Sequence, residues 1–396
     1  MVKTGGFLQA LRFVIMKAMR TGIATVPLDY GKCPPWLFLR MKQLGRGIML
    51  AIREEFGPDE VLKRLADPTW FQSLGCVMGF DWNSSGLTTT TLGALKAGVF
   101  DIQDQLGIYV CGGKKESRKT PEEIKAYSIS RGFGFEEKLI YASKMAAKVD
   151  SSLIQDIGSP FQLYQHNFIF SKSGNWAVIQ QGMSIEAQKA RRYHWLSGNI
   201  SDLTEEPHSG VACDMKASPL NLTAKESSKN RDVSKDLSQS PKTLLKDMRA
   251  ISEKYNNLIK QRRLPGFAEM ELSNVEFHWH PVASEKFNLK RLEKTIFSVK
   301  DQKPKNFESL LSLEGVGPKT IRALSLVAEI IYGAKPSYQD PARYSFAHGG
   351  KDGTPYPVDR DTYDKLLKVM QKGITKSAVS LREKQEAQGR LNKKML

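Results

Sequence analysis

The residues best suited to chemistry lie in the segment LLSLEGVGPKTIRALSL, toward the C-terminal end of the chain. Two glycines, Gly315 and Gly317, let the backbone of a short turn approach another surface, because no side chain stands in the way. Pro318 suits the first turn of a helix, where its missing N–H would have no partner. The N–H groups at the start of that helix form an anion site, and Lys319 and Arg322 add positive charge beside it. We therefore expect this turn to bind a phosphate oxygen.

This pattern resembles the helix-hairpin-helix element of DNA repair and recombination proteins. The resemblance implies a short helix over 307–313, a glycine turn and a second helix from Pro318, with the turn on the DNA backbone. The residues it places at the DNA are Gly315, Val316, Gly317, Lys319, Thr320 and Arg322. The alternative is a tight turn between two packed helices that meets no ligand.

A wider resemblance is to the glycosylase superfamily built on this hairpin, of which endonuclease III is a member. In that superfamily a PVD-type segment with an essential aspartate follows the hairpin, and in bifunctional members the hairpin lysine is the nucleophile. PYPVDRDTYDKLLKVM (355–370) resembles that segment, which implies Asp359 as the aspartate and Lys319 as the nucleophile. Such a carboxylate stabilises oxocarbenium charge on a flipped-out nucleotide, and a desolvated lysine forms a Schiff base at the same carbon. The alternative role for Asp359 is a helix N-cap.

A polar segment, DPARYSFAHGGKDG, lies between these two elements. It could cap a site or supply an acid or base, and His348 is its candidate for that role. The alternative is a solvent-exposed loop.

A second candidate for nucleic-acid contact is the basic and aromatic stretch AQKARRYHWL (187–196). Guanidinium groups pair with phosphates, and aromatic faces stack on exposed bases. This chemistry would place Arg191, Arg192, Tyr193 and Trp195 at the nucleic acid. The alternative is a helix whose aromatic side chains are buried and whose arginines are solvated.

A divalent metal site is a third candidate, because carboxylates and imidazoles far apart in the chain can meet in space. The candidate ligands are Asp81, His166, His194, His278 and His280. His278 and His280 share one face if the stretch FHWH is a strand. Each of these residues is alternatively structural.

The composition favours a polyanionic partner. The chain has 59 Lys and Arg against 42 Asp and Glu, a formal net charge of +17 in 396 residues, and such an excess attracts nucleic acid and releases its counterions. The four cysteines are far apart without a CxxC pair, so we expect no iron–sulfur cluster and a reducing compartment. No apolar run reaches the length of a membrane span. We therefore expect a cytoplasmic protein that binds DNA and no membrane.

The elements that must position these residues point to an α+β protein. The clearest β signal is the pair FQLYQHNFIF and WAVIQQGM around the turn SKSGN, which predicts a hairpin. Residues 35–66 have helical periodicity with a break at Gly57-Pro58, and GIYVCGG (107–113) is typical of a strand. The expected divisions are an N-terminal extension (1–18), a mixed α/β domain (19–200), a polar linker or loosely packed excursion (201–241), a mostly helical DNA-binding domain with the helix-hairpin-helix (242–372) and a basic tail (373–396).

From Arg20 to about Met370 the chain also resembles an uncharacterised prokaryotic family, common in thermophiles. The stretches RTGIATVPLDYGKCPPWLF, LYQHNF, QQGM, ARRYHW and DPARYSFAHGGKDG carry this resemblance, which transfers no activity. We expect a DNA-binding protein of DNA repair or processing, in its most concrete form a DNA glycosylase and abasic-site lyase. The alternatives are a metal-dependent nuclease with its site in the N-terminal domain and a non-enzymatic DNA-binding protein.

Overall fold

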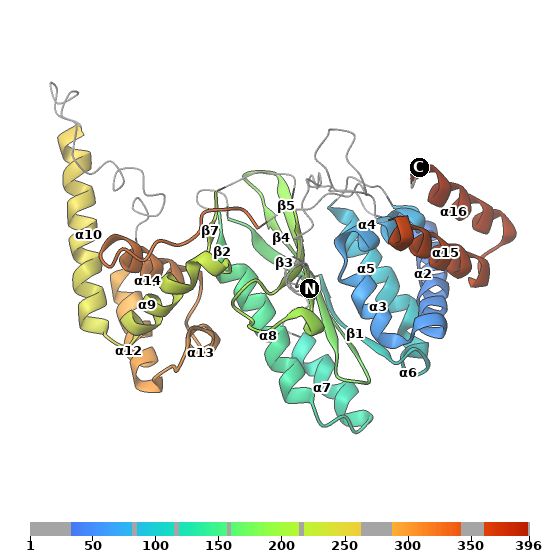
Figure 1. The fold of residues 1–396 in the computed structure, drawn as a ribbon, viewed down its shortest axis with the longest axis horizontal. Helices are drawn as coiled ribbons and strands as arrows, with labels where there is room; N and C mark the ends of the chain where they lie inside the picture. Colours follow the sequence, from blue (N-terminus) through green and yellow to red (C-terminus); the bar gives the residue numbers. More distant parts are fainter. Residues whose placement is uncertain are drawn as a thin grey trace, which may run out of the picture.

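A five-stranded antiparallel sheet forms the centre of the protein, with helices on both of its faces (Figure 1). The computed structural model describes residues 33–80, 85–114, 119–156, 160–213, 218–262, 287–341 and 360–394. In the order β1-β3-β4-β5-β6, the strands are β1 (Ile108–Lys114), β3 (Gln162–Ser171), β4 (Trp176–Ser184), β5 (Lys189–Leu196) and β6 (His208–Ala212). A small second sheet pairs β2 (Ile154–Gln155) with β7 (Leu220–Asn221).

The predicted β-hairpin is confirmed as β3 and β4, and the predicted strand over 107–113 is confirmed as β1. The turn between β3 and β4 contains Gly174 at φ 82°, a left-handed conformation that glycine adopts without strain. Side chains along the strands alternate between the two faces, so that Phe168 and Phe170 lie in one hydrophobic cluster and Ile169 in the other. The fold class expected from the sequence, α+β with a helical C-terminal part, is the one observed.

One face of the sheet is covered by N-terminal helices. The predicted break at Gly57-Pro58 separates the first two of them, because Pro58 starts a new helix. These helices are α2 (Pro35–Phe56), α3 (Pro58–Leu65), α4 (Pro68–Val77), α5 (Gly86–Val99) and α6 (Gln103–Leu106), with the short 3-10 turn η1 (Phe100–Ile102) between the last two.

The last two helices of the chain pack on this same N-terminal layer (Figure 1). They are α15 (Arg360–Lys376) and α16 (Leu381–Lys394). Glycines allow α15 to approach α2 closely, since a Cβ on Gly373 would lie 2.7 Å from the Ile48 Cα. The segment 373–396 was expected to be a basic tail, but Ala387 and Leu391 of α16 are buried and Arg390 donates to the Val77 carbonyl.

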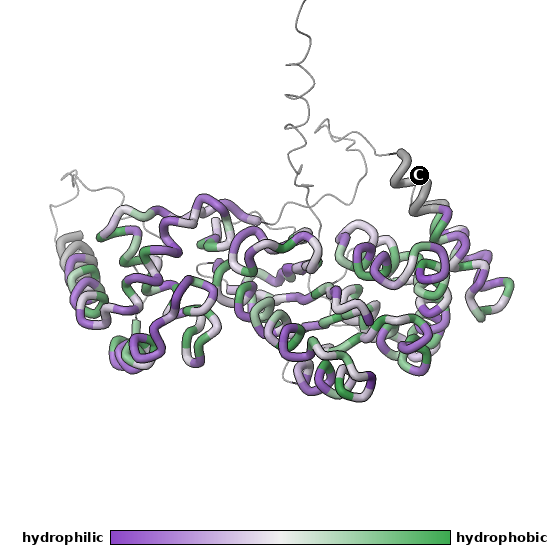
Figure 2. The backbone as a smooth tube through the Cα atoms, turned by 60° about the horizontal axis from the view of Figure 1, so that its bottom comes forward, coloured by the Kyte–Doolittle hydropathy of each residue, from purple (hydrophilic) through white to green (hydrophobic). Residues whose placement is uncertain are grey.

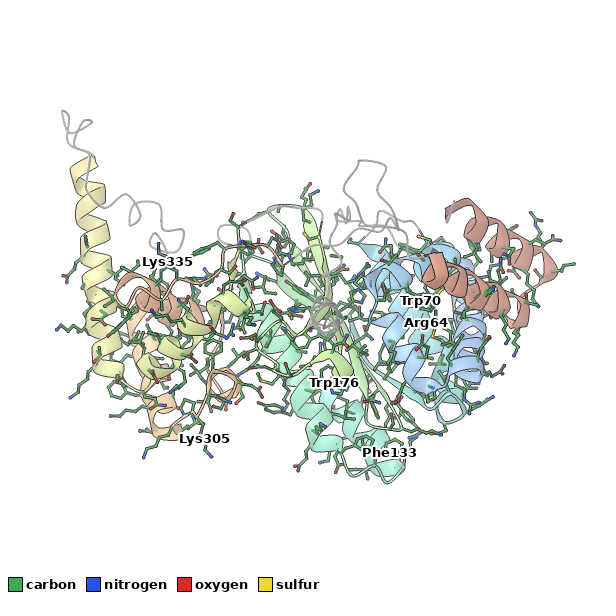
Figure 3. All side chains as sticks on the ribbon, in the orientation of Figure 1. Arg64, Trp70, Phe133, Trp176, Lys305 and Lys335 are labelled. Atoms are coloured by element: carbon green, nitrogen blue, oxygen red, sulfur yellow. The ribbon has the colours of Figure 1, made fainter. Side chains whose placement is uncertain are left out.

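The opposite face of the sheet is covered by α7 (Thr120–Ser130) and α8 (Glu136–Ser152). Trp70 and Trp176 lie on different sides of the sheet, the first among the N-terminal helices and the second toward α7 and α8 (Figure 3). A second group of helices packs beyond α8, in one continuous hydrophobic cluster with this face. These are α9 (Ser228–Ser238), α10 (Pro241–Arg262), α12 (Leu289–Gln302), α13 (Phe307–Ser312) and α14 (Pro318–Ile330). Hydrophobic and hydrophilic stretches alternate along many of these helices, as expected for helices with one buried face (Figure 2).

The segment 201–241 was expected to be a polar linker or a loose excursion, but its described residues, 201–213 and 218–241, are folded. It contains β6, β7, the 3-10 turn η3 (Lys225–Ser227) and α9, which follows it directly. Its polar side chains are buried because they bind main-chain carbonyls: Asn230 donates to Ser325 O and Ala334 O, and Arg231 donates to Leu222 O and Ala224 O. A polar composition is therefore compatible with burial here, since each group has a partner. No helix in the described part of the chain is long and apolar enough to cross a membrane.

Candidate functional site

The turn between α13 and α14 has the local geometry that its sequence predicts. Asn306 and Ser309 form a capping box that starts α13, and the helix ends at Ser312. Gly315 has φ 80°, in the left-handed region that favours glycine. Gly317 is the N-cap of α14, and Pro318 is its first residue. The two helices expected from the sequence are therefore present, and DNA contact by their turn stays a prediction.

Hydrogen bonds from α8 hold the turn at the C-terminal end of α13. The Lys148 ammonium donates to the carbonyls of Leu311, Ser312 and Leu313, at 2.8, 3.1 and 2.6 Å. Burial lowers the pKa of Lys148, partly offset by nearby Glu314. A cation at this position satisfies carbonyls that have no partner within the helix and interacts favourably with the helix dipole.

A second attachment holds the start of α14. The Gln155 amide donates to the Pro318 carbonyl at 3.2 Å, and Arg322 donates through Nε to Gln155 Oε1 at 2.7 Å. The Arg322 side chain therefore forms a hydrogen bond within the protein, to Gln155 of the small sheet. This bond uses Nε and the side chain is half-buried, so DNA contact by Arg322 stays a prediction.

The outer side of the turn is open. A Cβ on Gly317 would meet no atom within 4 Å, and the Lys319 side chain is exposed. A cavity of about 300 Å³ lies between this turn and α12, lined by Arg291, Thr295, Lys319 and Thr320 among others. Val316 and Thr320 are buried, 3% and 7% exposed, so that Val316 offers only main-chain atoms to a ligand.

The remaining residues of the hypothetical glycosylase site, Asp359 and His348, lie outside the described residues. Lys319 is the member of that set whose position the structure gives. Its side chain is exposed, so the described residues do not supply the desolvation that activates a lysine nucleophile.

The stretch Arg191–Trp195 lies in β5 and is not a surface feature. Arg191, Arg192, Tyr193 and Trp195 are at most 1% exposed, which corrects the expectation of a basic and aromatic face for nucleic acid. Arg191 pairs with Asp156 and with Asp340.

The neighbouring side chains of β5 explain why burial is tolerated there. Arg192 binds Gln72 at 2.7 Å and Thr88 at 3.1 Å, while Trp195 donates to Asp150 at 3.0 Å. Burial raises the pKa of Tyr193 well above that of an exposed tyrosine. Paired charges and satisfied donors remove most of the cost of placing these groups in the interior.

The metal candidates do not come together in the described part of the chain. His166 binds Ser143 and Gln180, and His194 binds Arg192 and the Leu65 carbonyl. Burial lowers the pKa of both imidazoles. Among the described residues no three His, Cys, Asp or Glu side chains are grouped for a metal ion; Asp81, His278 and His280 lie outside those residues.

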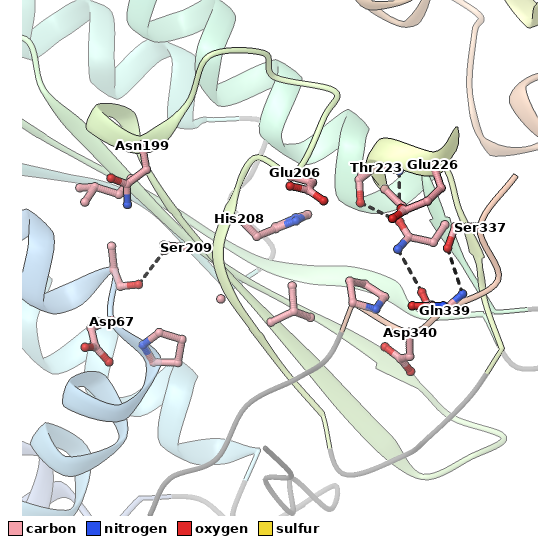
Figure 4. A pocket seen from close by; sticks show the side chains of 18 of the residues that line it. Asp67, Asn199, Glu206, His208, Ser209, Thr223, Glu226, Ser337, Gln339 and Asp340 are labelled. Carbon is pink, nitrogen blue, oxygen red and sulfur yellow. Dashed lines mark hydrogen bonds between the residues drawn. The ribbon is translucent and has the colours of Figure 1, made fainter. Parts of the chain in front are cut away.

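A second cavity, of about 470 Å³, contains residues that the sequence did not single out. Figure 4 shows His208 of β6 in its middle, with Asp67 on one side and Thr223, Glu226 and Asp340 on the other. His208 Nε2 lies 2.5 Å from Asp150 Oδ1, and the Asp150 carboxylate is buried. No local pattern could have revealed this pair, because Asp150 lies in the last turn of α8 and His208 starts an edge strand.

Comparison with known proteins gives a family and no activity. Residues 22–358 match the model of a family described as "Protein of unknown function (DUF763)". No curated protein and no solved structure matches the chain.

Proposed function

The chain belongs to the DUF763 family of proteins of unknown function, and we propose that it binds DNA without regard to sequence, through the turn between α13 and α14. The observation that carries the proposal is the open N-terminus of α14, where Gly317 presents bare backbone and Lys319 lies exposed beside it. The partner in this proposal is the phosphate backbone.

The start of α14 has the chemistry of an anion site. The first N–H groups of a helix have no partner within it, and the helix dipole favours negative charge at this end. The N-cap residue, Gly317, has no side chain that could accept a hydrogen bond from the first N–H groups of α14. The N–H groups of Lys319 and Thr320 are therefore suited to a phosphate oxygen.

Charge beside the turn supports an anionic ligand. Arg291 of α12 and Lys319 of α14 line the same cavity, and none of the described residues that line it is acidic. Guanidinium and ammonium groups are the side chains that most often contact phosphates. The overall charge of +17 adds a long-range attraction for nucleic acid.

The hydrogen bonds that hold the turn in place favour a preorganised binding site. Lys148 fixes the end of α13, and Gln155 fixes the start of α14. A backbone held in its binding conformation loses less entropy when the ligand binds. The repair chemistry implied by the wider resemblance, with Lys319 as nucleophile, goes beyond this proposal and stays a prediction.

The experiment is a salt titration of duplex binding followed by fluorescence anisotropy. Duplexes of unrelated sequence should bind with equal affinity, and the affinity should fall steeply as salt rises. Each phosphate contact contributes about 0.9 to the slope of log K against log salt, so Lys319→Ala and Arg291→Ala should each lower the slope by about that amount. Lys335→Ala is the matched control, because Lys335 lies beyond the opposite end of α14 (Figure 3). Slopes that respond equally to all three substitutions would contradict the proposed site.

A further inference from the structure

The cavity around His208 is separate from the turn between α13 and α14. Its walls come from α3 and α4, the edge strand β6, the region after β7, and the segment 337–341 that follows α14. Its volume of about 470 Å³ falls within the range of small-molecule sites. None of the residues that line it also lines the cavity beside Gly317.

His208 is held in one orientation by a buried carboxylate. Asp150 accepts from His208 Nε2 at 2.5 Å, from Trp195 Nε1 at 3.0 Å and from the Gln180 amide. Because an ionised carboxylate only accepts, the proton of His208 sits on Nε2. In the neutral imidazole Nδ1 is then an acceptor, and it has no hydrogen-bond partner among the residues that the structure describes. The His208 side chain is 7% exposed and lines the cavity.

The rest of the lining also offers acceptors. Glu206 and Glu226 are exposed carboxylates at the cavity, and Asp340 lies at its far side. Glu206 has φ 44°, a left-handed conformation that costs energy in a residue other than glycine. It is held there by a hydrogen bond from its N–H to the Thr223 carbonyl, at 2.8 Å.

Cationic side chains are few at this cavity. Lys63 is the one lysine or arginine among the described lining residues, and its ammonium lies 3.7 Å from Glu60. The cavity is therefore locally acidic in a chain whose overall charge is strongly positive. Apolar side chains, among them Pro68, Leu196 and Val211, complete the walls.

We propose that this cavity binds a small organic cation, in which an ammonium or guanidinium group on a short aliphatic chain donates to Glu206, Glu226 and His208 Nδ1. The carboxylates supply the charge, His208 supplies an oriented acceptor, and the apolar wall takes the aliphatic part. Phosphate groups are disfavoured here, so this site and the DNA site use different residues and opposite charge.

The test is isothermal titration of the full chain, without DNA, with spermidine and agmatine as probes and 1,4-butanediol as the neutral analogue. The amines should saturate a single site, and the diol should give no saturable heat. Glu206→Gln should weaken amine binding about tenfold or more, as expected for loss of a charged hydrogen-bond partner. Glu122→Gln removes the same charge from the exposed start of α7 and should leave binding unchanged.

Glu206→Gln is the deciding variant. His208→Asn would remove the hydrogen bond that buried Asp150 accepts from His208 Nε2, and this loss would destabilise the fold. Gly317→Leu should bind the amines like wild type, which separates failure of this site from failure of the DNA site. Three results would overturn the inference: no saturable heat at millimolar amine, equal binding of the diol, or unchanged amine affinity in both Glu206→Gln and Glu226→Gln.

Discussion

Replacing Lys148 by methionine should loosen the turn between α13 and α14. The substitution keeps most of the aliphatic stem and removes an ammonium that donates to three carbonyls, at 2.8, 3.1 and 2.6 Å. A hydrogen bond to a charged group contributes roughly 1.5–3 kcal/mol. The three bonds share one charge, and Lys148 is only partly buried, so water replaces part of the loss. We therefore expect the free energy of unfolding to fall by about 1.5–3 kcal/mol in total.

Urea unfolding followed by circular dichroism measures the stability, and anisotropy with a duplex measures binding by the folded protein. The matched control is Lys144→Met, one turn earlier on α8 with an exposed side chain; it should change stability by less than about 0.5 kcal/mol. Lys148→Met should also weaken duplex binding without changing its salt slope, because the phosphate contacts remain the same in number. Equal stability of the two variants would refute the role of Lys148. A destabilised Lys148→Met with wild-type duplex affinity would refute the need for a fixed turn.

Three further predictions concern the core and the hypothetical chemistry. Trp195→Ala should cost about 3–5 kcal/mol of stability, because Trp195 is fully buried; a folded variant that loses single-stranded DNA selectively would show instead that this ring stacks on bases. Burial lowers the pKa of His166 and His194 below the ordinary 6.5, so the unfolded chain takes up protons first and stability falls as pH drops below about 6.5. The loss is about 1.4 kcal/mol per pH unit for each histidine, and urea titrations from pH 7 to pH 5 should show a shallower slope in His166→Gln; an unchanged slope would contradict this. If Lys319 is a lyase nucleophile, borohydride should trap an adduct with abasic-site DNA in wild type and none in Lys319→Ala, whereas an adduct that persists in the variant would place the nucleophile elsewhere.

Local signals explain the parts of the fold that the sequence predicted correctly. The β3–β4 hairpin has a Gly174-Asn175 turn between two β-rich runs, and the α2–α3 boundary has Gly57-Pro58. The helices around Gly315 follow from a capping box, a left-handed glycine and a proline at the first helical position. Each of these signals acts within a few residues, so a single sequence contains it.

Long-range partners explain what the sequence could not show. A strand buried on both faces has no alternation of polar and apolar residues, and Arg191 is buried because Asp156 and Asp340 meet it in space. The pair formed by His208 and Asp150 likewise joins an edge strand to the last turn of α8. Neither partner carries a local pattern, so the candidate cavity could be found only from the folded chain.

The central claim is that bare backbone at Gly317 contacts DNA, and Gly317→Leu tests it most directly. Gly317 has extended backbone, φ −144°, and an added Cβ meets no atom within 4 Å, so the fold should survive at a cost of about 1 kcal/mol for a poorer N-cap. Gly134→Leu is the matched control, because Gly134 also has open space around its Cβ position and lies between α7 and α8. Duplex affinity is measured by anisotropy at several salt concentrations on variants with wild-type circular dichroism. The account predicts that Gly317→Leu loses most of its affinity at every salt concentration while Gly134→Leu keeps it; wild-type affinity in a folded Gly317→Leu would contradict the account.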